Sequence, residues 1–140
     1  MSGNIRVDLF TQRNRGVLVT LKRDGRPQMS NVAFSFEQAT QVIRISVTNN
    51  RAKTNNLRRD PRASFYVTND DMSGYLVAEG EAELSTVAED PDDDTVNELV
   101  SIYRAVSGEH PDWSEFRTAM VNEERLVIRL PISRTYGWAH

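Results

Sequence analysis

The sequence has 140 residues, with 20 acidic and 17 basic side chains and a formal net charge of −3 at pH 7. This length predicts one domain over residues 1–140. The acidic balance argues against a general nucleic-acid-binding protein, which usually carries a basic excess. The chain has no cysteine, which excludes disulfides, thiolate metal sites and a thiol nucleophile.

Targeting and membrane segments are not expected. No apolar run approaches the roughly 20 residues that a membrane-spanning helix needs. The N-terminal stretch "MSGNIRVDLF" contains neither a long apolar run nor a small-residue cleavage site, so we predict no signal peptide. These features, with the lack of cysteine, predict a cytoplasmic protein without membrane contact.

The first half of the chain predicts strands separated by tight turns. Asp24-Gly25 is typical of a hairpin with a type I′ turn, in which both central residues have positive φ. Ile43 and Ile45 alternate with polar residues, as expected for a half-buried strand. Gly80 is expected at a bulge or a close approach between segments. The predicted strands are residues 16–22, 28–36, 41–47, 63–67 and 75–84.

The second half of the chain changes to helical spacing of apolar residues. Helices are expected at 92–106 and 112–122, and the acidic start of the first suits the positive end of a helix dipole. Residues 125–138 return to a strand pattern, in which Pro131 should break or edge the pairing. Five or more short strands and two late helices predict a mainly β, α+β protein, a small antiparallel barrel with helices outside it.

Few side chains suit a metal site or a catalytic triad. The two histidines are His110, in a turn between the predicted helices, and His140, the last residue. We expect His110 to be solvated or to cap a helix. The acidic run 89–94 lacks the glycine and terminal glutamate of an EF-hand loop and is interpreted as a solvated helix start. With two histidines, no cysteine and no EF-hand loop, no metal site is predicted. The phosphate-binding GxGxxG and GxxxxGK motifs are also absent.

The segment 51–62 is the most basic part of the chain. It carries a formal charge of +4, while the rest of the protein sums to −7. Arg51 and Lys53 would point to one side of an extended chain. A short helix over 54–60 would direct its first N–H groups to the same place. These features, with the Thr54 hydroxyl, predict a binding site for a phosphate or carboxylate group.

The remaining basic residues of this segment have a simpler interpretation. No lysine or arginine occurs between Arg62 and Arg104, although the stretch from Asp70 to Glu98 is rich in acids. We therefore expect surface ion pairs between this stretch and the three arginines Arg58, Arg59 and Arg62.

The sequence also resembles a known family. The resemblance is carried by "LVTLKRDGRPQMSNVAFSF" (18–36), "RAKTNNLRRDPRASFYV" (51–67), "YLVAEGEAEL" (75–84), "PDDDTV" (91–96) and "LPISRTYGW" (130–138). These segments are similar to the pyridoxamine-phosphate-oxidase-like (PPOX-class) split β-barrel family. Within it they look most like the actinobacterial branch that uses the deazaflavin coenzyme F420. The resemblance covers nearly the whole chain.

This resemblance implies a fold, an assembly and a cofactor site. The fold would be a small antiparallel FMN-binding-like split β-barrel of six to seven strands with peripheral helices. Two chains would form a homodimer with the cofactor in a groove touched by both. Arg51 and Lys53 would bind the phosphate beside Thr54. The other groove residues implied are Asn31, Val32, Ala33 and Phe34 along the ring, Ser46, Val47 and Thr48 near the ring or ribityl chain, and Ser73, Gly74 and Tyr75.

The implied activity is a hydride transfer from reduced F420 to a conjugated small molecule, such as an enone, a quinone-like compound or a tetrapyrrole. The cofactor then carries the chemistry and no nucleophile or metal is needed. Tyr75 and Tyr136 are weak candidates for a proton donor, and the catalytic residues are otherwise unassigned. Two alternatives remain open. One is an FMN-dependent enzyme of the same family, since FMN also carries a phosphate. The other is a protein that binds F420 without turnover.

Overall fold

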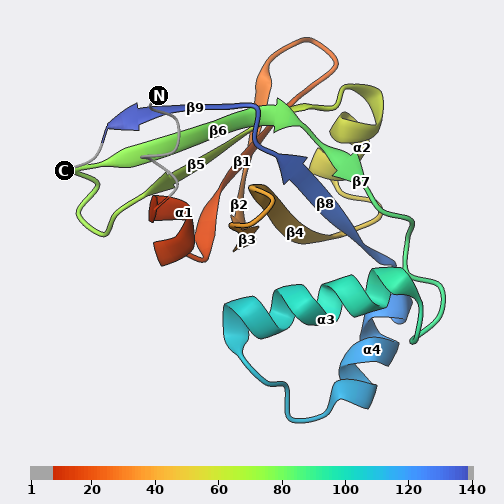
Figure 1. The fold of residues 1–140 in the computed structure, drawn as a ribbon. Helices are drawn as coiled ribbons and strands as arrows, with labels where there is room; N and C mark the ends of the chain where they lie inside the picture. The colour runs from red at the N-terminus through yellow and green to blue at the C-terminus, as the bar shows by residue number, and fades with distance from the viewer. Residues whose placement is uncertain (1–7, 139–140) are drawn as a thin grey trace.

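We describe the fold from a computed structural model, which defines residues 8–138. Most of the N-terminal segment considered as a signal peptide, and His140, lie outside these residues. Within the described residues, nine strands form two antiparallel sheets, which confirms the predicted mainly β split barrel (Figure 1). The five-stranded sheet has the order β2 (Pro27–Ala33), β1 (Arg15–Leu21), β5 (Arg62–Thr68), β6 (Tyr75–Glu81) and β9 (Arg134–Trp138). The four-stranded sheet has the order β3 (Ser35–Glu37), β4 (Val42–Thr48), β8 (Arg125–Pro131) and β7 (Glu83–Leu84).

Three of the predicted strands are each divided between the two sheets. The segment 28–36 breaks at Phe34, 75–84 breaks at Ala82, and 125–138 breaks after Pro131. At each break the chain passes from one sheet to the other, so these breaks form the corners of the barrel. A Cβ atom at Gly80 would collide with the carbonyl oxygen of Pro131, so the predicted close approach at this glycine is confirmed.

The predicted hairpin joins β1 and β2, but its turn is not of type I′. In this loop only Gly25 has positive φ, at 85°. The Gly25 N–H donates to the Lys22 carbonyl, and the Lys22 N–H donates to the Arg26 carbonyl, both at 2.9 Å. This pattern is that of a three-residue loop closed by a glycine bulge. Asp24 therefore keeps negative φ, and its side chain accepts a hydrogen bond from the Arg26 N–H.

Side chains fill the interior of the barrel. Phe34 and Phe65 are fully buried, with ring centroids 4.7 Å apart. Phe10 joins them from α1 (Asp8–Gln12), a short helix that the sequence did not predict. Leu18, Ile45 and other buried aliphatic residues complete this cluster. Since the interior is packed with side chains, a ligand has to bind outside the barrel.

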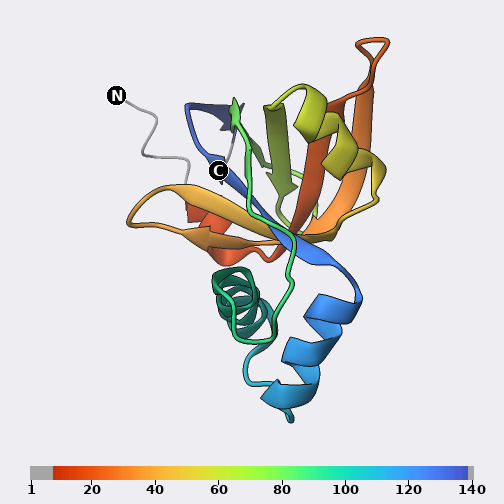
Figure 2. The same cartoon turned by 90° about the vertical axis from the view of Figure 1, so that its right-hand side faces the viewer.

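Helices α3 (Asp94–Ser107) and α4 (Trp113–Asn122) form a hairpin beneath the four-stranded sheet (Figures 1 and 2). Asp93 and Asp112 cap them by accepting backbone N–H groups, so the acidic run is a capped helix start, as predicted. His110 is half-buried, and its Nδ1 accepts the N–H of Asp112 at 2.9 Å, while Asp112 itself caps α4. No helix within residues 8–138 is long and apolar enough to cross a bilayer.

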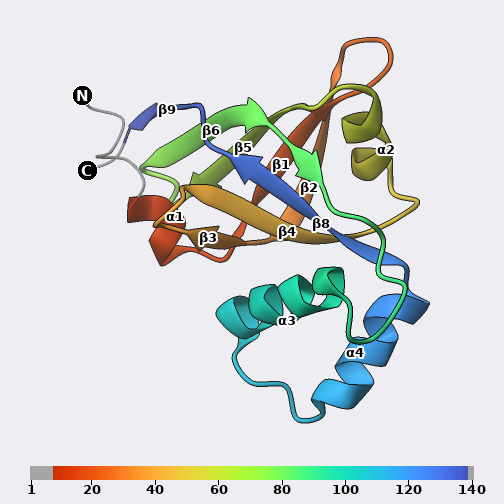
Figure 3. The same ribbon diagram turned by 45° about the vertical axis from the view of Figure 1, so that its right-hand side comes forward.

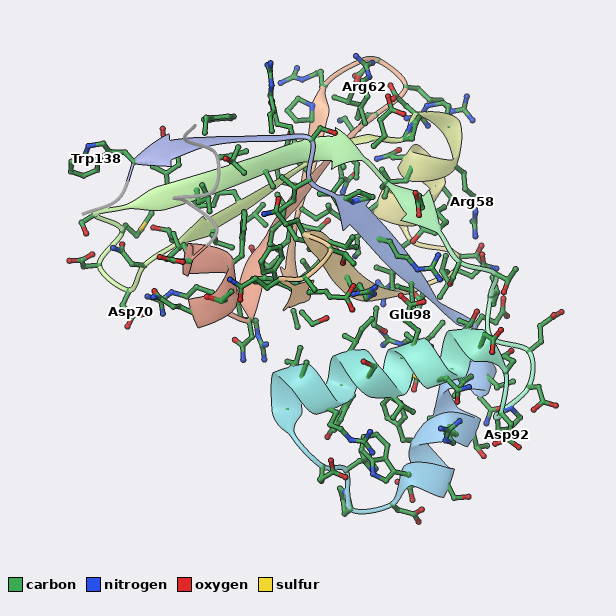
Figure 4. All side chains as sticks on the ribbon, in the orientation of Figure 1. Arg58, Arg62, Asp70, Asp92, Glu98 and Trp138 are labelled. Carbon is green, nitrogen blue, oxygen red and sulfur yellow. The ribbon has the colours of Figure 1, made fainter. Side chains whose placement is uncertain are left out.

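A half-buried ion-pair network holds this helical hairpin to the sheet. Glu98 on α3 is labelled in Figure 4. Its carboxylate forms ion pairs with Arg44 of β4 at 2.8 Å and with Arg129 of β8 at 2.6 Å. Burial opposes ionisation of Glu98, but the hydrogen bonds from the two arginines outweigh it and lower the pKa of its carboxyl group. The network therefore ties two neighbouring strands to one helix.

Candidate functional site

A cleft of about 610 Å³ lies between the barrel and the helical hairpin. This volume is within the range of small-molecule sites. Figure 3 shows the elements around it, namely β2, β4, the helical hairpin and α2 (Ala52–Arg59). The cleft-lining residues are Arg15, Asn31, Val32, Ala33, Ser46, Val47, Thr48, Arg51, Lys53, Leu99, Ile102, Tyr103, Val106, Ser107, Phe116, Met120 and Arg125.

Cations and hydroxyl groups gather where β4 ends and α2 begins. Arg51 precedes the first helical residue, and its Nε donates to the Thr48 hydroxyl at 2.9 Å. Arg125 faces Thr48 in the β4–β8 register, and its Nη1 donates to the Ser46 hydroxyl at 3.3 Å. Lys53 has no hydrogen bond or ion pair to any described residue. No acidic side chain lines the cleft.

This concentration of positive charge perturbs Lys53. Partial burial, and then the charges of Arg51 and Arg125, lower the pKa of the Lys53 amine below its ordinary value of 10.5. A bound anion would reverse the repulsion and provide the missing partner. The donor set therefore suits a phosphate or carboxylate group.

The rest of the cleft is largely apolar. Val32 and Ala33 of β2 line the barrel side, and Asn31 adds an amide at the edge. Val47 of β4 also borders the cleft, but its side chain is 2% exposed and packs in the barrel core. The opposite wall comes from the helical hairpin, through Leu99, Ile102, Tyr103, Val106, Phe116 and Met120. A cationic end next to apolar walls fits a ligand with an anionic group attached to a flat, conjugated body.

Eight of the thirteen predicted cofactor-binding residues meet in this cleft: Asn31, Val32, Ala33, Ser46, Val47, Thr48, Arg51 and Lys53. The local structure of the last two differs from the prediction. The helix begins two residues earlier than expected, so Arg51 is extended at the N-cap while Lys53 lies in the first turn. Both nevertheless reach the same cleft.

Two predicted residues face the wrong way. Phe34 is 1% exposed and packs against Phe65 inside the barrel, because the chain turns its corner there. Thr54 is 0% exposed, and its hydroxyl donates to the Thr48 carbonyl at 3.0 Å. Neither side chain is available to a ligand in the cleft, so both assignments are corrected.

Ser73, Gly74 and Tyr75 lie in and after the β5–β6 turn, at the end of the five-stranded sheet opposite α2 (Figure 1). Asn69 organises this turn by accepting the Gly74 N–H and donating to the Ser73 hydroxyl. The three residues do not line the cleft of their own chain. Tyr136 is also remote, since it pairs with Val77 on the same sheet.

Sequence reasoning missed two cations and one whole wall of the cleft. Arg15 and Arg125 begin β1 and β8 and carry no local motif. Only the strand register brings Arg125 beside Thr48. The apolar residues of α3 and α4 were expected at helical spacing, but that spacing does not say which strand end they cover.

The expected ion pairs of the basic segment are mostly wrong. Arg58 donates to the Asn49 carbonyl and the Asn55 amide oxygen. Arg59 donates to the Leu21 carbonyl and the Asn56 amide oxygen. Arg62 pairs with Asp60 at 2.8 Å; only its cross-strand neighbour Glu81 belongs to the predicted acidic stretch.

Comparisons with known proteins agree with this geometry. An F420H(2)-dependent biliverdin reductase of Mycobacterium tuberculosis is 27% identical over 130 residues, which are 93% of this chain and 83% of the relative. The crystal structure of the conserved hypothetical protein Rv2991 from the same species matches with a TM-score of 0.76 and 24% identity, over 100% of this chain and 86% of that one. A structure titled F420 reductase matches with a TM-score of 0.70 and 21% identity, over 93% and 94% of the two chains.

The family model described as pyridoxamine 5'-phosphate oxidase matches residues 6–139. This match spans nearly the entire sequence, including both sheets, the cationic end of the cleft and the helical hairpin. The chain therefore belongs to the pyridoxamine 5'-phosphate oxidase family.

Proposed function

We propose that this protein is an F420-dependent reductase that passes a hydride to a conjugated small-molecule acceptor. The main support for this function is the cleft, which has cations at one end, apolar walls and no acidic residue among the described residues that line it. The similarity to an F420H(2)-dependent biliverdin reductase supports the choice of cofactor. An enone, a quinone-like compound or a linear tetrapyrrole has the extended π-system that such a site would accept.

The residues of the cleft have distinct roles in this proposal. Arg51, Lys53 and Arg125 bind the anionic part of the cofactor through charge-assisted hydrogen bonds. Val32 and Ala33 support the face of the ring, and the helical wall excludes water from it. When bound, the deazaflavin supplies the hydride that reduces the acceptor. The protein's contribution is to hold the reacting carbons close, which lowers the barrier without a nucleophilic side chain.

We further propose that two chains form the working unit. Among residues 8–138, five large apolar side chains are exposed, and all lie on the five-stranded sheet or its β5–β6 turn: Met29, Met72, Tyr75, Tyr136 and Trp138. Alternation along the strands puts Met29, Tyr75 and Tyr136 on the face that points away from the core. A second copy covering this face could bring its Ser73, Gly74 and Tyr75 to the cleft.

The dimer predicts a mass near twice 15.9 kDa in light scattering. Met29→Glu combined with Tyr136→Glu should give monomers, because each carboxylate would be desolvated at the interface. Thr118→Glu, on the exposed surface of α4, is the control and should leave the mass unchanged. A wild-type protein that stays monomeric at micromolar concentration would refute the proposal.

The activity is tested by following the oxidation of reduced F420 with a panel of enones, quinones and biliverdin. We expect turnover with at least one acceptor and a loss of turnover in Arg51→Ala. Tight F420 binding without turnover on any acceptor would favour the non-catalytic carrier. Turnover that needs FMN and proceeds without F420 would favour the FMN-dependent alternative.

A further inference from the structure

A second hollow, here called the hairpin groove, lies between α2 and the β1–β2 hairpin and has a volume of about 860 Å³. It shares no lining residue with the cofactor cleft. Figure 2 shows the hairpin standing beside α2. Four cationic side chains, Lys22, Arg23, Arg58 and Arg59, line the groove with one carboxylate, Asp24. The groove therefore has a formal surplus of three positive charges in a protein whose net charge is −3.

The two arginines from α2 are fixed by neutral partners. Arg58 is held by the Asn49 carbonyl at 3.1 Å and the Asn55 amide oxygen at 2.9 Å. Arg59 is held by the Leu21 carbonyl and by the Asn56 amide oxygen at 3.2 Å. Such contacts orient a guanidinium group without neutralising it, so both positive charges remain available.

Carboxylates near the groove are already engaged. Asp24 accepts the Arg26 N–H within the hairpin turn at 3.0 Å. Asp60 influences Arg59, but its carboxylate is bound by Arg62, and this hydrogen bond lowers the pKa of Asp60 to about 2.

The hairpin contributes two cations that have no such partner. Lys22 and Arg23 are exposed, and the side chain of neither makes a hydrogen bond or ion pair with any described residue. Elsewhere in residues 8–138, seven arginines pair with carboxylates. The hairpin groove departs from this pattern, because four cationic side chains line it with a single carboxylate, Asp24.

We propose that the hairpin groove is a second anion site, which takes a small flexible ligand with several carboxylate or phosphate groups. A ligand with several charges suits the groove best, because four cations from two separate elements line it. The ligand could be free in solution, or it could be the anionic tail of a cofactor held in the cleft. Arg51 and Arg58 are seven positions apart, which is about 10 Å along a helix, a distance that a short charged chain can cover.

The test uses the full chain and two probes, inorganic tripolyphosphate and a γ-linked oligoglutamate, titrated at low ionic strength. The variant Lys22→Gln/Arg23→Gln removes two cations that make no contact, so the fold should persist. We expect wild type to bind both probes and the variant to bind them at least fivefold more weakly. The control Arg104→Gln/Arg134→Gln removes the same charge elsewhere and should bind as wild type does. Equal binding by wild type and the groove variant, or no binding by wild type, would overturn the proposal.

A second arm identifies the source of the anion. F420 with its glutamate tail and F420 lacking it are each titrated into wild type and into the groove variant. A weaker affinity of the variant for the tailed form alone assigns the groove to the tail, an assignment that rests on the proposed function. Unchanged affinity for both forms, with lost tripolyphosphate binding, assigns the groove to a free polyanion. Since tripolyphosphate needs no cofactor, the groove can be confirmed even if the protein does not use F420.

Discussion

Strands β4 and β8 carry two groups of cations with opposite surroundings. Where β3 pairs with β4, Arg44 and Arg129 are cross-strand partners that both bind Glu98. At the other end of the same strand pair, Arg125 joins Arg51 and Lys53 in a cleft that contains no acid. Arg125 pairs with Glu123, which does not line the cleft, whereas Arg51 and Lys53 have no carboxylate partner among the described residues. What separates these two cations from Arg44 and Arg129 is whether the protein supplies their counterion.

This difference separates a structural role from a binding role. Where Glu98 neutralises the arginines, the charges hold a helix to a sheet. Where the counterion is missing, partial burial and then repulsion from Arg51 and Arg125 lower the pKa of Lys53. The protein has 20 acidic residues, but none of those in the described part of the chain lines this cleft. The cleft therefore suits an external anion. Variants of each group should therefore affect different measurements.

The largest effect is expected from Glu98→Gln. The substitution removes the charge that faces Arg44 and Arg129, so Arg129 is left partly buried without its ion-pair partner and Arg44 keeps only Glu37. We expect a loss of about 3 kcal/mol in the free energy of unfolding, measured by urea denaturation. Asp70→Asn is the matched control, since Asp70 pairs with Arg13 but its side chain is 95% exposed; its loss should stay below about 0.5 kcal/mol. Equal losses would show that the network does not hold the hairpin.

The next effect concerns binding rather than stability. Arg51→Ala and Lys53→Ala should each weaken F420 binding by about ten- to hundredfold, because each removes a charge-assisted contact worth about 1.5–3 kcal/mol. Their free energies of unfolding should change little, since neither residue has a carboxylate partner to lose. Arg62→Ala, which breaks an exposed pair with Asp60, is the control and should change affinity less than about threefold. Equal effects at Arg51 and Arg62 would contradict the division between the two groups.

The smallest effect is a dependence of affinity on pH. The Lys53 amine has a lowered pKa, and anion binding favours its charged form. Affinity for F420 should therefore be highest while Lys53 is protonated and should fall as the pH rises through this lowered pKa, by no more than Lys53→Ala loses. Lys53→Arg keeps its charge over this range, so its affinity should stay constant. The same decline in Lys53→Arg would assign the pH dependence to another group.

Much of the fold could be predicted because its signals are local. β-rich composition, alternation and turn signals located the strand segments, and an acidic run marked the start of the first long helix. The corners were not predicted, because residues such as Phe34 stay apolar where the chain leaves one sheet for the other. Helix α1 was missed because it is held mainly by one buried residue, Phe10. Local patterns therefore reveal elements better than the points where elements exchange partners.

The cleft was predicted only as far as its residues lie in one sequence motif. Arg51 and Lys53 follow directly from the basic segment, and Asn31 and Ser46 followed from the family resemblance. Arg125 could not be predicted, because its position beside Thr48 depends on the β4–β8 register. The helical wall depends on Glu98 and its two arginines, which lie far apart in the sequence. Long-range packing, rather than composition, completes the site.

The most direct test of the central claim is a titration of the cofactor-free protein with F420 and with FMN at low and high salt. The account predicts that F420 binds more tightly than FMN. It also predicts that F420 affinity falls with added salt, because exposed charges are screened over about 10 Å at 0.1 M ionic strength. FMN binding tenfold more tightly than F420, or FMN that remains bound through purification, would contradict the assignment of the cleft to the deazaflavin.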